Sequence, residues 1–138
     1  MRAAASRFFL LAVLLAALPA LAQDKVVYHL SELEQASRGL EYIRNHLEVN
    51  PKAAIVVVAH AGGVDFLMKG AKSPRGNEFR QAIEDLELQG VKFDVCEITL
   101  RERGLKREQF LPIAKFVPSG VAEIARLQNR EGYAYLRP

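Results

Sequence analysis

The feature that most constrains the fold is the segment Ala53–Ala59, AAIVVVA, which is apolar at every position and rich in β-branched side chains. A strand with no polar face has to be covered on both sides, and this is the pattern of a central strand in a parallel sheet. Parallel strands are joined by crossovers that usually contain a helix, so helices are expected on both faces. The segment therefore predicts an α/β fold in which a mostly parallel sheet lies between helix layers.

The rest of the sequence supplies the other strands and the helices of such a fold. Further strands are expected at 25–30, 90–100, 114–117 and 133–136. The capping box Ser31–Glu34 predicts the start of a helix that ends before Pro51, and Ser119 is expected to cap another that ends at Gly132. The alternation of strands and helices indicates βαβ units.

The amino-terminal residues have the pattern of an export signal. Arg2 and Arg7 precede an apolar run, Phe8–Leu18, and the sequence Ala20-Leu21-Ala22 provides small residues at a cleavage site. The run is too short to cross a membrane comfortably. We predict that residues 1–22 are a signal peptide, cleaved after Ala22, and that the protein is exported to the periplasm with no membrane span left.

Removing the signal leaves residues 23–138, a length typical of one domain. The formal charge of the whole chain is +3, and it falls to +1 once Arg2 and Arg7 are removed. No arginine-rich tract or basic patch with interleaved aromatic residues is present, so a nucleic-acid partner is not expected.

Cys96 is the only cysteine, and it lies near the carboxyl end of the predicted strand 90–100. An intramolecular disulfide is therefore excluded. Three interpretations stay open, namely a buried structural thiol, an intermolecular disulfide and a reactive group. Reactivity needs a lowered pKa, which a helix amino terminus, an imidazolium or a lysine near the thiol would provide.

Other polar residues also follow the predicted strands, at the edge of the sheet where ligands usually bind. His60 precedes two glycines whose backbone amides could bind an anion, and Ser119 begins a helix. A histidine that is simply satisfied at the sheet edge is the competing interpretation. No close pair of ligands supports a metal site, and no cofactor is expected. The expected ligand-binding residues are His29, His60, Gly62, Gly63, Ser119 and Gly120.

Three segments resemble the DsrE/DsrF-like family, in its exported branch: 90–96 (GVKFDVC), 117–121 (VPSGV) and 132–135 (GYAY). The resemblance implies a three-layer α/β/α sandwich with a mostly parallel five-stranded sheet, assembled into trimers or hexamers. Relatives carry sulfur as a persulfide between partner proteins, so Cys96 would be the sulfur acceptor. In cytoplasmic relatives the cysteine usually lies in a mobile loop, whereas Cys96 is expected within a strand. The adjoining Glu97 would oppose thiolate formation if its carboxylate pointed the same way as the thiol.

Two functional hypotheses follow from these observations. In the first, the protein is a sulfur carrier or sulfurtransferase in which Cys96 receives sulfur from a small sulfur anion or from a donor protein and passes it to an acceptor protein. In the second, it is a non-enzymatic, oligomeric module for small-ligand binding or assembly, in which the cysteine is structural. The sequence does not decide whether the protein is an enzyme.

Overall fold

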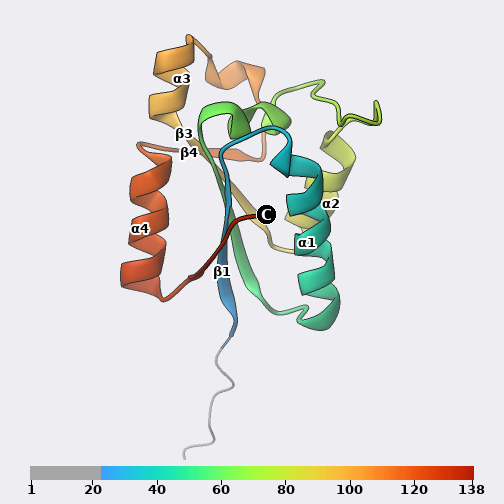
Figure 1. Cartoon of the computed structure of the whole chain (residues 1–138), viewed down its shortest axis with the longest axis vertical. Coiled ribbons are helices and arrows are strands. Elements are labelled where there is room, and N and C mark those ends of the chain that lie inside the picture. The colour runs from blue at the N-terminus through green and yellow to red at the C-terminus, as the bar shows by residue number, and fades with distance from the viewer. Residues whose placement is uncertain (1–22) are drawn as a thin grey trace, which may run out of the picture.

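The computed structural model describes residues 23–138, and its centre is a five-stranded sheet in which every strand pair is parallel (Figure 1). The order of strands is β4-β3-β2-β1-β5, so the apolar strand β2 lies in the middle as predicted. The strands are β1 (Lys25–Leu30), β2 (Ala54–Ala59), β3 (Lys92–Cys96), β4 (Ala114–Val117) and β5 (Ala134–Leu136).

Helices cover both faces of this sheet. Helices α1 and α2 lie on one face and α4 on the other, while α3 lies beyond the carboxyl ends of the strands (Figure 1). The helices are α1 (Gln35–Val49), the 3₁₀ helix η1 (Ala61–Leu67), α2 (Arg80–Leu88), α3 (Glu97–Arg103), the 3₁₀ helix η2 (Arg107–Gln109) and α4 (Gly120–Glu131). The predicted three-layer α/β/α sandwich is confirmed.

Strand β2 is apolar throughout because its alternate side chains enter two different cores. Ile55, Val57 and Ala59 belong to the large core beneath α1 and α2. Val56 and Val58 belong to a smaller core that includes Ile124 and Leu127 of α4. Successive side chains of a strand point to opposite faces, so one residue spacing builds both cores.

One predicted helix start is wrong, and one is confirmed. Helix α1 begins at Gln35, and the Ser31 side chain does not cap it. Instead, the side-chain oxygen of Gln35 accepts hydrogen bonds from the backbone N–H groups of Ser31 and Glu32, at 2.9 and 3.2 Å. At α4, the Ser119 hydroxyl accepts a hydrogen bond from Ala122 N–H, as expected of a capping serine.

The predicted strand 90–100 is also too long, because β3 ends at Cys96 and α3 follows immediately. Burial explains the change: Thr99 and Leu100 are both buried by the helical turn, whereas an extended chain would place them on opposite faces. Cys96 is thus the last residue of a strand and the cap residue of a helix.

The predicted signal peptide, residues 1–22, lies outside the described residues. Within 23–138, no helix is both long enough and apolar enough to cross a membrane.

Candidate functional site

The carboxyl ends of β1, β2 and β3 meet the amino terminus of α4, and this junction brings together four of the predicted site residues. A Cβ atom added to Gly120 would lie 3.2 Å from the Cβ atoms of both His60 and Cys96. The ring of His60 in turn contacts the ring of His29. Gly120 is therefore the point at which α4 packs against both chemical groups, and a larger residue would push them away.

Cys96 is buried, with 5 % of its surface exposed, at the start of two helices. Burial raises the pKa of its thiol, but hydrogen bonds from the backbone N–H groups of Gly120, Thr99 and Ile98, and from the Thr99 hydroxyl, outweigh burial. The net effect is a pKa below the ordinary value, because these donors favour the thiolate. Backbone amides therefore lower the pKa of the thiol, a role for which an imidazolium and a lysine were also candidates.

Glu97, which was expected to oppose thiolate formation, is neutralised by a neighbour. Its carboxylate forms an ion pair with Arg107, whose guanidinium also lies over the ring of Phe116. The pair directs the Glu97 charge toward η2. The carboxylate is absent from the groups that shift the pKa of Cys96.

The two histidines at the junction are hydrogen-bonded to each other. The Nε2 atoms of His29 and His60 are 2.6 Å apart, and the rings stack with centroids 4.8 Å apart. The Nδ1 atom of His29 is also 2.6 Å from the hydroxyl oxygen of Tyr135 on β5. Tyr135 is a site residue that the sequence did not single out, and only its place next to β1 in the sheet reveals it.

Both rings are neutral near pH 7. Burial lowers the pKa of His29 to about 4, and the neighbouring His60 and the positive charge of Arg137 add to the effect. Burial and the charge of Arg137 also lower the pKa of His60. Both nitrogens of His29 are already engaged, so only His60 can bind an anion as an N–H donor, and neither ring supplies an imidazolium to the thiol.

Helix α3 holds the loop after His60 in place. Ala61 has a positive φ of 49°, which is unfavourable for a residue with a side chain. Its N–H donates to the Thr99 hydroxyl at 2.8 Å, and its carbonyl accepts from Arg103 at 3.0 Å. Arg103 is also paired with Asp65 of η1. Thr99 thus contacts both Cys96 and Ala61. The predicted strand 90–100 gave no indication of these contacts.

The predicted anion-binding glycines 62 and 63 lie in the first turn of η1. The N–H of Gly63 donates to the His60 carbonyl at 2.9 Å, so it is already used. A Cβ on Gly63 would lie 2.1 Å from the Leu30 carbonyl oxygen, and close packing against β1 therefore requires glycine here. The Ser119 hydroxyl is likewise engaged by its own helix.

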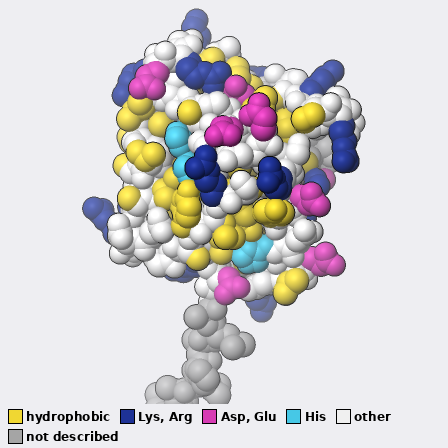
Figure 2. Space-filling model, viewed as in Figure 1, with side chains coloured by type: hydrophobic (Ala, Val, Ile, Leu, Met, Phe, Trp, Pro, Cys, Tyr) yellow, Lys and Arg dark blue, Asp and Glu magenta, His cyan; other side chains and the backbone are white. Residues whose placement is uncertain are grey.

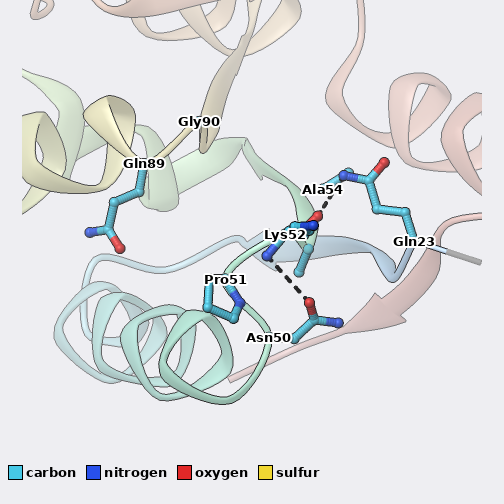
Figure 3. Close-up of a pocket in the computed structure, with 8 residues that line it drawn as sticks. Gln23, Asn50, Pro51, Lys52, Ala54, Gln89 and Gly90 are labelled. Atoms are coloured by element: carbon cyan, nitrogen blue, oxygen red, sulfur yellow. Dashed lines mark hydrogen bonds between the residues drawn. The ribbon is translucent and has the colours of Figure 1, made fainter. Parts of the chain in front are cut away.

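A separate hollow lies at the opposite edge of the sheet, near the amino ends of the strands (Figure 3). It has a volume of about 720 Å³. It is lined by Gln23, Asn50, Pro51, Lys52, Ala53, Ala54, Gln89 and Gly90. These residues include neither cysteine nor histidine, so the hollow is separate from the junction. Among residues 23–138, no three histidine, cysteine or acidic side chains are grouped closely enough to hold a metal ion.

Comparison with known proteins gives the family and the fold. The family model described as the DsrE/DsrF-like family matches residues 12–138. The structure is similar to that of MTH1491, a protein of unknown function from Methanobacterium thermoautotrophicum. That similarity has a TM-score of 0.74 and 33 % identity, and it covers 84 % of this chain and all of the other.

A second structure has the same fold at lower identity. The YchN protein from E. coli aligns with a TM-score of 0.70 and 17 % identity, again over 84 % of this chain and all of that one. A search of curated protein sequences found no match. The family match extends over most of the chain, and it includes the junction at Cys96. The chain belongs to the DsrE/DsrF-like family.

Proposed function

We propose that the protein handles sulfur and that Cys96 accepts a sulfane sulfur as a persulfide. The observation that carries the proposal is the set of hydrogen-bond donors around the thiol, which lowers its pKa. A thiolate is the nucleophilic form of cysteine, so this environment prepares Cys96 for attack. Membership of a family associated with sulfur relay supports the same conclusion.

The chemistry needs no separate oxidant. The Cys96 thiolate attacks the terminal sulfane sulfur of a polysulfide and forms a new S–S bond at Sγ. The older S–S bond breaks, and its electron pair leaves with the shortened polysulfide anion. With thiosulfate, the leaving group is sulfite. An acceptor thiol can then attack the outer sulfur of the persulfide, so that Cys96 is released for another cycle.

The burial of Cys96 favours a small inorganic donor. Only 5 % of the residue is exposed, so a bulky donor has little surface to contact. His60, whose Cβ lies beside Gly120, is the side chain near the thiol that can donate a hydrogen bond to an anion, and the start of α4 adds the positive end of its helix dipole. We infer that these groups hold the negatively charged end of the donor while sulfur is transferred.

Export and self-association complete the proposal. We propose that the protein acts in the periplasm as a homo-oligomer, as a trimer or hexamer, and exchanges sulfur with a donor or acceptor protein. Figure 2 displays hydrophobic side chains gathered across the middle of one face. The exposed side chain of Leu136 on the short edge strand β5, which is 44 % exposed, supports an interface on this side of the sheet.

The proposal is tested by incubating the purified protein with polysulfide under native conditions and measuring its intact mass. We expect added sulfur that a reductant removes, and none on Cys96→Ser. The variant must keep its folded circular dichroism spectrum for the comparison to hold. An unmodified wild-type protein would show that Cys96 is not a sulfur acceptor.

The same burial favours one other candidate, a binding or assembly module with a structural cysteine. In that case Cys96 would react with a small alkylating reagent only in denaturant. Its replacement by serine would then lower the free energy of unfolding by about 1–3 kcal/mol without affecting a reaction. Native alkylation therefore separates the two functions before any sulfur compound is tested.

A further inference from the structure

A continuous row of three hydrogen-bonding side chains joins the surface to the junction at Cys96. Tyr135, at the outer end, is 41 % exposed on the edge strand. Its hydroxyl contacts Nδ1 of His29, and Nε2 of His29 contacts Nε2 of His60. The Cβ of His60 lies beside Gly120, which also contacts Cys96. Each of the two contacts between ring or hydroxyl atoms is 2.6 Å, which is within hydrogen-bond distance.

The neutral rings allow only two arrangements of protons along this row. One hydrogen lies between the two Nε2 atoms, so the ring that donates it must accept at its other nitrogen. In the first arrangement, Tyr135 donates to His29, His29 donates to His60, and His60 carries a hydrogen on Nδ1. In the second, every bond is reversed and Nδ1 of His60 is bare. The first arrangement becomes the second when one proton moves across each contact, Nδ1 of His60 gives up its hydrogen, and Tyr135 takes one from water.

His60 has one ring nitrogen that is not engaged by His29. Its Nε2 is occupied by His29, which leaves Nδ1 as the nitrogen that can exchange a proton. Nδ1 is bonded to the ring carbon that carries Cβ, and this Cβ is the atom beside Gly120. The row therefore ends at His60, whose Cβ lies beside Gly120, one of the hydrogen-bond donors to the Cys96 sulfur.

Burial, with a smaller contribution from a nearby positive charge, keeps the row neutral. Arg137 donates to the Ser31 hydroxyl at 3.0 Å and to the Glu32 carboxylate at 3.4 Å. Its charge opposes a second proton on either histidine. A proton taken up at Tyr135 is consequently passed along the row rather than stored as an imidazolium.

We propose that Tyr135, His29 and His60 form a proton relay that serves sulfur transfer at Cys96. This inference rests on the proposed function. During loading, the departing sulfur anion takes a proton from Nδ1 of His60, the row shifts by one proton at each contact, and water reprotonates Tyr135. During hand-over, the acceptor thiol gives up its proton as it attacks the persulfide, and that proton returns the row to its first arrangement. Each cycle thus leaves the relay unchanged.

The test compares the rate of polysulfide loading in Tyr135→Phe and in wild type, with Tyr42→Phe as the control. Tyr42 is a similarly exposed tyrosine, 46 % exposed, on α1. Removing the Tyr135 hydroxyl should slow loading at least about tenfold, since a positioned proton donor contributes about 10²-fold or more. The control should load at the wild-type rate. Added imidazole buffer should restore the rate of Tyr135→Phe, which it would not do if the hydroxyl were only structural.

Nitrogen NMR of the histidine rings gives a second measurement that needs no sulfur compound. Both rings should be neutral at pH 7, and Tyr135→Phe should change which nitrogen of His29 carries the hydrogen. A wild-type loading rate in Tyr135→Phe, or a slow rate that imidazole does not restore, would overturn the relay. So would an imidazolium signal from either ring at pH 7. Failure of wild type itself to load would instead refute the proposed function, and the relay for sulfur transfer with it.

Discussion

The two faces of the sheet differ in what they contain. The face beneath α1 and α2 is packed with apolar side chains, including three phenylalanine rings in edge contact. The face beneath α4 has a small apolar core and carries the polar residues His29, Asp94 and Cys96. In β3, alternate side chains lie on opposite faces of the sheet, so Phe93 and Val95 enter the large core while Asp94 and Cys96 lie on the other face. The face beneath α1 and α2 therefore stabilises the fold. The face beneath α4 can then hold buried polar groups that lower the stability.

The largest effect should come from the apolar face. Ile43 of α1 is fully buried in the large core, so Ile43→Ala should lower the free energy of unfolding by about 2–5 kcal/mol. Denaturant titration measures this loss. The rate of Cys96 alkylation in the remaining folded protein should not change. A loss below about 1 kcal/mol would show that this core is not the main source of stability.

Gly120→Ala should affect stability and chemistry together, which sharpens the contrast between the faces. The new methyl group would lie 3.2 Å from the Cβ atoms of both His60 and Cys96, and such overpacking costs about 1–3 kcal/mol. Displacing the Gly120 N–H from the sulfur should also raise the pKa of Cys96. Gly39→Ala on α1 is the matched control, because its methyl group would meet only side-chain atoms and no site residue. An unchanged pKa in Gly120→Ala would contradict the assigned role of this amide.

Asp94 should make stability depend on pH. The side chain is buried with one oxygen unpaired, and burial raises its pKa to about 6 from an ordinary 3.8. The folded protein then holds the proton over the range from about pH 4 to pH 6, where the unfolded chain has lost it. Stability contributed by this group is therefore lost as pH rises through that range. Asp94→Asn should remove the dependence and stabilise the protein by about 1–3 kcal/mol at pH 8.

Thermal unfolding at pH 4 and pH 8 tests this prediction. The wild type and Asp94→Asn should differ little at the lower pH and clearly at the higher one. The exposed Glu48→Gln serves as the control for removal of one negative charge. If Asp94→Asn were the less stable protein at pH 8, the carboxylate would be contributing favourable interactions with Lys115 or Arg126 that outweigh its burial.

The smallest effect is expected at the cap of α4. Ser119→Ala removes the hydrogen bond to Ala122 N–H, which should cost about 1 kcal/mol. Denaturant titration again gives the value, with Ser119→Asn as a variant that can restore the cap. Loss of sulfur loading beyond the loss of stability would mean that Ser119 also contacts the donor.

The sequence predicts the fold well because apolar periodicity carries most of the information. The unbroken apolar run in β2 places it at the centre of the sheet. The regularly spaced apolar residues of α1, which include Leu40, Ile43 and Leu47, pack into the large core. The exact end of β3 is not predicted because Glu97–Leu100 can be read as strand or helix. In the helix, Thr99 contacts Cys96, which is close to it in the sequence, and Ala61, which is distant in the sequence.

The candidate site is only partly predictable for a related reason. The sequence identifies His29, His60 and Cys96 as polar residues near the ends of strands. The distances between them depend on the order of the strands in the sheet. The pair of histidines exists because β1 and β2 are adjacent, and Tyr135 joins them because β5 adds to the other side of β1. Nothing local in the sequence marks Tyr135 as part of the site.

Hydrogen bonds from the amides at the start of α3 and α4 lower the pKa of the Cys96 thiol and so favour its thiolate form. The most direct measurement is the pH dependence of Cys96 alkylation in the native protein, with a small uncharged reagent. The rate should rise to a plateau with a midpoint below 9.0, the ordinary pKa of the thiol. A midpoint at or above 9.0, or labelling that occurs only in denaturant, would contradict the claim and make the cysteine structural.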